Sequence, residues 1–269
     1  MKIAYIHLYG SKLITKKRSN VLKKELERVF PKVLINVRKS ISISLPNDYP
    51  EKCRTIDRTS TPYTNGFQNK SIYNNDSFQG KGKCLTLLDG FGLQRIYSDF
   101  ISEDEMELEH VHVIFKDSLI STYDEITRRF HARTLICGTP SIISTTGIIE
   151  APAKPRDYYF KMMLSDLLDR SNEEIKTKFN GRFIDYGDPS VFCAALGFAV
   201  QAVFYFLTDG NPFCIENTCT LYNSHWQEEM IRAQVKTPKF CKYHETQLSF
   251  IYQNLLIVDQ LYKVWPQLL

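Results

Sequence analysis

Two close pairs of metal-ligand residues constrain the fold of this chain more than any other feature. Cys214 and Cys219 form one pair, Cys241 and His244 form the other, and the segment between the pairs is long enough for one helix. Zinc prefers four thiolate or imidazole ligands in a tetrahedron, and ligands close in sequence are gathered at a lower entropic cost. We therefore predict one structural Zn2+ bound by these four side chains. The alternative is a set of buried or unpaired cysteines beside an unrelated histidine.

An apolar segment precedes the first pair. Residues 191–207 are apolar on almost every side, which is typical of a helix buried inside a protein. Asp188 and Pro189 stand at its start, where a capping carboxylate and a proline are favoured. Together with the ligand pairs, this segment predicts a helical, zinc-bound C-terminal subdomain over residues 188–269.

The N-terminal part has the pattern of an α/β layer. Residues 2–7 and 33–37 are short apolar strands, and residues 21–30 between them have helical spacing. Residues 45–82 are rich in Asn, Ser, Thr, Lys and Gly, which predicts a surface insertion. The predicted fold class is α/β in the broad sense (α+β), with a mixed sheet and packed helices in a single domain over residues 1–269.

Composition bears on the compartment and on the partners. The seven cysteines are an odd number, no secretory signal precedes them, and no window approaches the roughly eighteen apolar residues of a membrane span. These features favour a cytoplasmic protein without a membrane partner. The formal net charge of +4 is too small to indicate a nucleic-acid partner.

A strand over residues 110–115 carries two histidines. Because side chains alternate along a strand, His110 and His112 share one face of it. Two such residues can bind a metal, although two half-buried polar side chains on a sheet are the simpler interpretation.

The C-terminal half resembles a known family. The Ile143-Ser144-Thr145 strand end and the four zinc-type ligands resemble the archaemetzincins, a branch of the metzincin metallopeptidases. The runs at 140–156 and 223–229 are more similar to an uncharacterised archaeal group of metallopeptidases. The resemblance covers roughly residues 113–244. It implies a metzincin-like mixed sheet, with Cys214, Cys219, Cys241 and His244 as the structural zinc site.

The catalytic motif of that family is missing. Metzincins carry His-Glu-x2-His-x2-Gly-x2-His, in which the helical histidines bind zinc and the glutamate activates water. Here Gln201 and Tyr205 occupy the positions of the first two histidines, Ala202 replaces the glutamate, and the third histidine is absent. We therefore expect no catalytic zinc on this helix.

Three interpretations follow. In the first, which we favour, peptidase chemistry is lost and the protein binds a peptide or protein partner along an edge strand at Ser141–Thr145. His131 and Arg133 would line the same wall. The residues expected to bind the partner are Ser144, Thr145, Glu150, Lys154 and Arg156.

The second interpretation is an active hydrolase with a relocated metal site. Its candidate catalytic residues are His131, Glu150, His225 and Glu228, with Lys154 and Arg156 nearby. His225 and Glu228 are predicted to share one helical turn. The third is a zinc-containing nucleic-acid-binding protein, for which no basic and aromatic module is visible. Metal counting separates the first two, because one zinc supports the scaffold and two support the enzyme.

Overall fold

The structure of the chain, a computed structural model, describes residues 3–41, 87–168, 171–236 and 238–252. The insertion predicted at 45–82 lies outside the described residues, as does the chain after residue 252.

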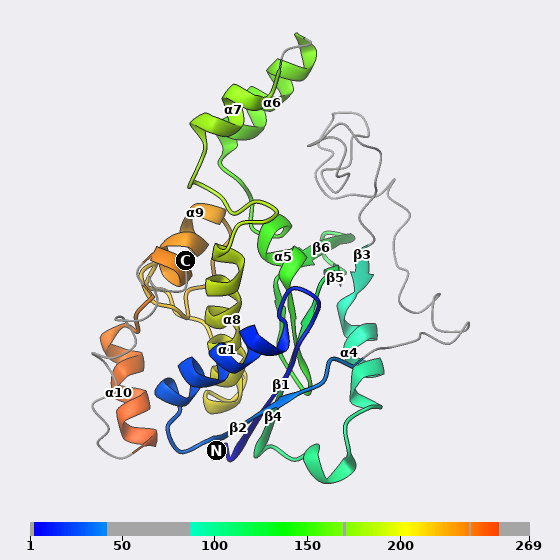
Figure 1. Cartoon of the computed structure of the whole chain (residues 1–269). Helices are drawn as coiled ribbons and strands as arrows, with labels where there is room; N and C mark the ends of the chain where they lie inside the picture. Colours follow the sequence, from blue (N-terminus) through cyan, green and yellow to red (C-terminus); the bar gives the residue numbers. More distant parts are fainter. Residues whose placement is uncertain (1–2, 42–86, 169–170, 237, 253–269) are drawn as a thin grey trace.

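A five-stranded mixed sheet forms the centre of the molecule (Figure 1). Four strands are parallel and β7, at one edge, is antiparallel to β8. In sheet order the strands are β2 (Leu34–Arg38), β1 (Tyr5–Tyr9), β4 (His110–Lys116), β8 (Ser141–Ser144) and β7 (Leu135–Ile136). The apolar runs of β1 and β4 fit central strands with both faces covered.

A second sheet has three strands. β5 (Leu119–Asp124) lies between β3 (Leu87–Asp89), which is parallel to it, and β6 (Arg129–Arg133), which is antiparallel. One residue separates β6 from β7, so this stretch of chain passes from the small sheet into the large one. The two sheets therefore share one border.

Helices cover both faces of the large sheet. Figure 1 shows α1 (Lys16–Val29) and α8 (Ser190–Leu207) on one side and α4 (Gly90–Ser98) on the other. The larger apolar core lies on the α1 and α8 side, and a smaller cluster including Leu93 and Ile142 lies beneath α4.

Helix α8 is the buried helix that the sequence predicts, and the Oδ1 atom of Asp188 accepts a hydrogen bond from the N–H of Ser190 at its start. The expectation that no segment reaches the length and hydropathy of a membrane span is wrong for this helix. However, 83% of its apolar window is buried inside the protein, so core packing accounts for its composition.

Shorter α-helices and one π-helical turn precede and follow α8 in the chain. They are α5 (Thr145–Glu150), α6 (Arg156–Leu167), α7 (Glu173–Lys178), α9 (Gln227–Met230), the π-helical turn η3 (Ile231–Lys236) and α10 (Lys242–Ile251). Helices α6 and α7 project from the body of the molecule, at the top of Figure 1.

Three local features show how side-chain caps and strand pairing set the ends of elements. Residues 145–150 form helix α5, and Ser144 caps it by accepting a hydrogen bond from the N–H of Gly147 at 2.7 Å. Residues 123–130 form the tip of the β5–β6 hairpin, with a turn at 125–128 between the two strands. Asp89 ends β3 and caps α4, since its carboxylate accepts a hydrogen bond from the N–H of Phe91.

Candidate metal centre and binding cleft

The four zinc-type ligands lie together at the C-terminal end of the fold. Cys214 and Cys219 belong to the connection after α8, Cys241 precedes α10, and His244 stands in its first turn. All four are buried, and one ligand atom from each lies within 4.8 Å of the others. The structure thus forms a candidate Cys3His metal site, as the sequence predicts, while the identity of the ion and the stoichiometry stay predictions.

The distances within this group fit a tetrahedral zinc. The sulfur atoms of Cys214 and Cys241 are 3.7 Å apart, and Nδ1 of His244 lies 3.0 Å from the sulfur of Cys241 and 3.7 Å from that of Cys219. Bond lengths of about 2.3 Å to sulfur and 2.0–2.1 Å to nitrogen place two thiolates about 3.8 Å apart and a thiolate and an imidazole about 3.5 Å apart. The group therefore needs only small side-chain adjustments to hold the ion.

The electrostatics argue against a reactive cysteine in this group. Burial raises the pKa of the Cys219 thiol and of the Cys214 thiol well above the ordinary value, and it lowers the pKa of His244. A thiol with a raised pKa is a poor nucleophile, whereas a bound metal ion displaces its proton directly. The chemistry that suits these residues is structural metal binding.

Gln201 connects α8 to the ligand loop. Its side chain is 1% exposed, and its Nε2 donates hydrogen bonds to the carbonyl oxygens of Thr220 and Tyr222, at 3.0 and 3.1 Å. These acceptors directly follow Cys219 in the chain. Gln201 therefore holds the loop that presents the first ligand pair.

Replacing Gln201 with leucine should destabilise the protein by about 2 kcal/mol, because two buried carbonyl groups lose their donor. Thermal unfolding with zinc present measures the cost. Tyr205→Phe, one turn further along α8 and half-buried, is the control and should leave the melting temperature almost unchanged. Equal melting temperatures for both variants and the native protein would contradict this role.

A cleft of about 420 Å³ lies beside α8. One wall is the unbroken run His131–Leu135, the opposite wall combines residues 151–153 with 223–226, and Phe198, Gln201 and Phe213 complete the lining. Neighbouring side chains of a strand point to opposite faces of the sheet, so a cleft over one face would be lined by every second residue. Because five consecutive residues line this cleft, the chain presents its edge to it.

That open edge is not the predicted one. β8 pairs with β4 on one side and with β7 on the other, so the prediction of an edge strand at Ser141–Thr145 is wrong. Among the described strands, β6 pairs with β5 alone and β7 with β8 alone. The free edge in the cleft therefore belongs to β6 and β7, which includes His131 and Arg133 as predicted for this wall.

The predicted binding residues lie in different places. Ser144 and Thr145 are buried, donate hydrogen bonds to Ser118 O and to the carboxylate of Asp117, and do not line the cleft. Neither Glu150 nor Lys154 lines the cleft. Glu150 forms a hydrogen bond with Tyr186, and the ammonium group of Lys154 lies 4.6 Å from the ring centre of Phe183.

Arg156 lies next to the cleft, in contact with one of its lining residues. It is exposed, and its guanidinium lies 5.4 Å from the ring centre of Trp226, which lines the cleft. A cation held over an aromatic ring at the rim can attract a carboxylate.

The candidate catalytic residues are separated in space. His131 and His225 both line the cleft, whereas Glu150 and Glu228 do not. Glu228 accepts a hydrogen bond from Arg182 at 2.7 Å. His225 precedes helix α9, so the prediction that it shares a helical turn with Glu228 is wrong: the carboxylate of Glu229 accepts from the N–H of His225 and delays the helix start to Gln227.

The cleft does not fit a metzincin-type catalytic zinc. The side-chain amide nitrogen of Gln201 already donates hydrogen bonds to backbone carbonyls. Ala202 carries no functional group, and Tyr205 does not line the cleft. In the described part of the chain, two groups of three or more metal-ligand side chains come close together. Neither contributes a residue to the cleft, and the second group, three histidines from β1 and β4, is considered below.

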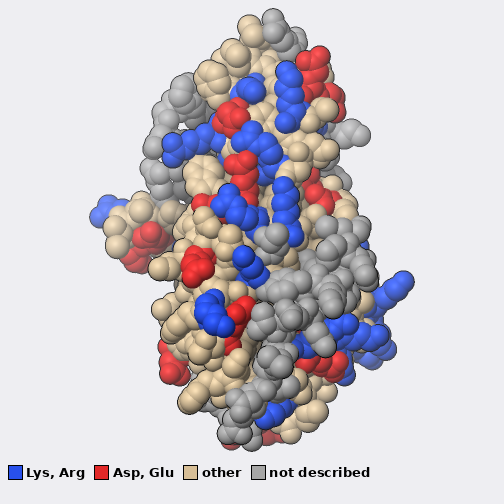
Figure 2. Space-filling view, turned by 90° about the vertical axis from the view of Figure 1, so that its left-hand side faces the viewer, with Lys and Arg blue, Asp and Glu red and all other residues tan. Residues whose placement is uncertain are grey.

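Sequence reasoning missed Phe198, Phe213 and Trp226 as cleft residues. All three are large aromatic side chains in apolar or loop segments, where position relative to the sheet edge cannot be read from spacing. Figure 2 shows Lys and Arg side chains interspersed with Asp and Glu on the face that it presents.

Comparison with known proteins agrees with the resemblance drawn from the sequence. Residues 2–251 match the Probable metallopeptidase family (DUF6775), so the chain belongs to that family. The predicted relationship to metallopeptidases is thereby confirmed, and the mixed sheets with packed helices confirm the predicted fold class.

Two solved structures are similar to the chain. The zinc-dependent peptidase from Methanocorpusculum labreanum (strain Z) is 12% identical, with 90% of this chain and 99% of that chain covered and a TM-score of 0.45. Archaemetzincin from Methanopyrus kandleri is 10% identical, with 94% and 97% covered and a TM-score of 0.42. No curated protein matches the sequence.

Proposed function

We propose that this member of the probable metallopeptidase family binds an extended peptide, or an unfolded segment of a protein, along the free edge of β6 and β7. One structural zinc at the Cys3His group would hold the fold that presents the cleft. The observation that carries the proposal is the strand edge His131–Leu135, which is open to a cleft of about 420 Å³.

An added strand suits this cleft chemically. A peptide that pairs with a sheet edge gains affinity from main-chain hydrogen bonds and specificity from pockets for alternate side chains. Phe198, Phe213 and Trp226 offer apolar surface for those side chains, and Arg156 at the rim offers a charge for an acidic side chain or a C-terminal carboxylate.

The proposal assigns no hydrolysis to this cleft. The residues on α8 do not fit a catalytic zinc. Glu150 and Glu228, the carboxylates that a relocated active site would use, lie outside the cleft that His131 and His225 line. Binding along a strand edge needs no catalytic residue, so it can persist where peptidase chemistry has been lost.

Peptide N-methylation tests the binding mode directly. A fluorescent extended peptide selected for binding is synthesised with one N-methyl group at each position in turn, and its Kd is measured by anisotropy. Because only alternate amides of a strand face the partner strand, affinity should fall roughly tenfold or more at every second position and little between them, as each lost hydrogen bond costs about 1.5 kcal/mol. A flat profile, or no binding by any extended peptide, would refute strand addition.

Arg156→Ala should weaken capture of a peptide with an acidic end by about threefold to tenfold, because an exposed charge pair contributes about 1 kcal/mol. Zinc content and melting temperature should not change, since the side chain is exposed. Lys161→Ala, on the same projecting helix but with its ammonium group over the ring of Phe179 instead of Trp226, is the matched control. The role assigned to Arg156 fails if both variants bind the peptide as tightly as the native chain.

A further inference from the structure

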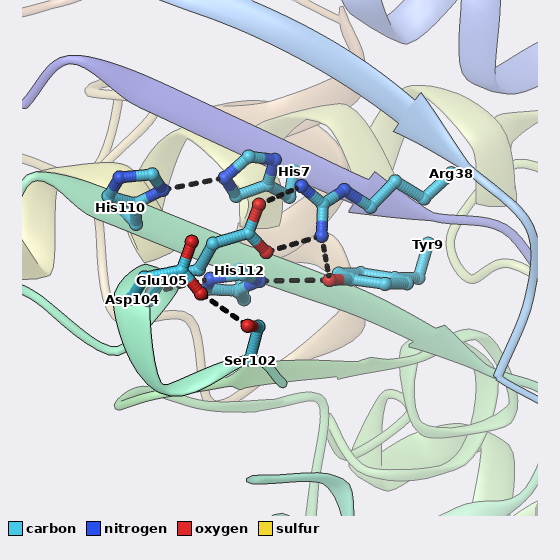
Figure 3. A network of polar contacts seen from close by, with 8 residues as sticks. All are labelled: His7, Tyr9, Arg38, Ser102, Asp104, Glu105, His110 and His112. Carbon is cyan, nitrogen blue, oxygen red and sulfur yellow. Dashed lines mark hydrogen bonds and ion pairs between the residues drawn. The ribbon is translucent and has the colours of Figure 1, made fainter. Parts of the chain in front are cut away.

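Three histidines gather on the face of the large sheet that looks away from α8. On β1, Ile6 and Leu8 enter the core beneath α1 and α8, so the alternate residues, His7 among them, point to the opposite face. The parallel register places His7 opposite His112, and His110 lies two residues before it on the same face. Figure 3 shows the three rings side by side above the sheet.

The three histidines lie close together and are largely buried. One ring nitrogen from each histidine lies within 4.8 Å of the others. His7 and His112 are 1% and 0% exposed, and His110 is half-buried. Nε2 of His7 lies 2.9 Å from Nδ1 of His110. Three imidazoles are thus packed together, and each has a nitrogen that suits a transition metal.

Residues around the group orient one of the rings. Nε2 of His112 donates to the carbonyl oxygen of Glu105 at 2.9 Å, which leaves the lone pair on Nδ1. Nδ1 in turn lies 3.0 Å from the hydroxyl of Tyr9. A ring held in one tautomer by a backbone carbonyl is the arrangement found around metal-binding histidines.

The nearby charges balance each other. Arg38 and Glu105 form a two-pronged ion pair with distances of 2.6 and 2.5 Å, and Arg38 also donates to the hydroxyl of Tyr9 at 3.1 Å (Figure 3). The guanidinium therefore does not stand as an uncompensated cation beside the imidazoles. A divalent ion can enter without meeting a net positive site.

One atom of the group is left without a partner. Nδ1 of His7 is buried and makes no hydrogen bond to any residue that the structure describes. A buried ring nitrogen without a partner costs about 1–3 kcal/mol, and native proteins contain few of them. Packing alone gives no reason for this atom, whereas a ligand that needs nitrogen donors does.

We propose that His7, His110 and His112 bind one divalent transition-metal ion of the zinc class, with the fourth position open to water or to the hydroxyl of Tyr9. An ion at 2.0–2.1 Å from each nitrogen holds the nitrogens about 3.3 Å apart. The ligand nitrogens now lie within 4.8 Å of one another, so any two of them must move closer by at most about 1.5 Å. His7 and His110 now stack with an angle of 18° between their rings, so loading requires rotation of the side chains.

This site is separate from the Cys3His group and from the cleft. It lies across the sheet from α8, on strands β1 and β4, and it shares no residue with either. The inference is therefore independent of the proposed peptide binding. It also changes how a count of two metal ions per chain is interpreted, because a second ion bound here would not be evidence for a metal in the cleft.

Metal stoichiometry tests the proposal. The full chain, with any affinity tag removed, is saturated with Zn2+, freed of excess by gel filtration and analysed by mass spectrometry of metals. We expect two zinc ions per chain, and one in His110→Gln, whose half-buried position tolerates the change. His131→Gln, a half-buried histidine on β6 outside the group, is the control and should keep two.

Cobalt gives a readout that needs no variant. Co2+ at the Cys3His group produces a thiolate-to-metal charge-transfer band, whereas Co2+ bound by three imidazoles produces only weaker d–d bands. A titration should therefore show two equivalents with different spectra. In His110→Gln, the affinity for the imidazole equivalent should fall by more than the about 10–100-fold that loss of an outer-shell partner costs.

The outcomes are decisive in either direction. A single equivalent with thiolate bands in the native chain would overturn the proposal, and so would two equivalents that His110→Gln leaves intact. Circular dichroism of His110→Gln, compared with the native chain, ensures that a lost equivalent reflects the lost ligand rather than unfolding.

Discussion

Cys219→Ala is expected to unfold or aggregate, and removal of metal by a strong chelator should have the same effect on the native chain. Structural zinc contributes on the order of 10 kcal/mol or more of apparent binding free energy at neutral pH, while a folded domain is stable by only about 5–15 kcal/mol. Loss of one ligand therefore removes an amount of stability comparable to the whole. Cys219 is also fully buried, so no water can replace its thiolate.

Cys193→Ala is the matched control for this prediction. Cys193 is equally buried but lies on α8, outside the ligand group. Its replacement should lower the melting temperature by a few degrees, through lost packing, and leave the zinc content unchanged. A Cys219→Ala protein with native zinc content and native melting temperature would show that the group is not a metal site.

Gly147→Ala is expected to destabilise the protein by about 3 kcal/mol and to weaken peptide binding. A Cβ atom at position 147 would lie 2.3 Å from the carbonyl oxygen of Arg133, and 2.9 Å from the hydroxyl of Ser144. The first obstacle is backbone, so no rotamer change relieves it, and α5 must move away from β6. The melting temperature should fall by about 6–12 °C.

The same displacement would reach the cleft. Arg133 belongs to the strand edge that lines it, so a shift of β6 should weaken peptide capture together with stability. Thr146→Ala, the neighbouring position on the same helix, removes atoms instead of adding them and should be nearly neutral in both measurements. Native stability in Gly147→Ala would mean that α5 and β6 do not approach so closely.

The sequence predicts some parts of this molecule because their cause is local. Cys214 and Cys219 are near each other in the chain, as are Cys241 and His244, so their ligand chemistry is visible without knowing the fold. Residues 191–207 are likewise recognisable as a core helix, since their composition suits no exposed position.

Other parts depend on pairing between distant segments and were predicted wrongly or not at all. Whether β8 is an edge strand depends on β7, a strand of two residues that turns back against it. Helix α5 contains Thr145, Thr146 and Gly147, which are poor helix formers, and its cap and its packing on β6 override that propensity.

The histidine group has the same origin. His110 and His112 could be seen to share a face, but their approach to His7 depends on the register between β1 and β4, about a hundred residues apart. A histidine in an N-terminal strand becomes informative only when a second strand with histidines at alternate positions is known to lie beside it.

The breadth of the main core has a consequence for synthesis on the ribosome. That core contains residues from Ile3 to Tyr252, and the candidate metal ligands Cys241 and His244 lie near its C-terminal limit. More than two hundred residues separate the end of α1 from His244, and at 5–20 residues per second they take about 10–40 s to translate. The apolar faces of β1 and α1 stay uncovered during that interval, because the proposed zinc site can form only when nearly all of the described chain has emerged.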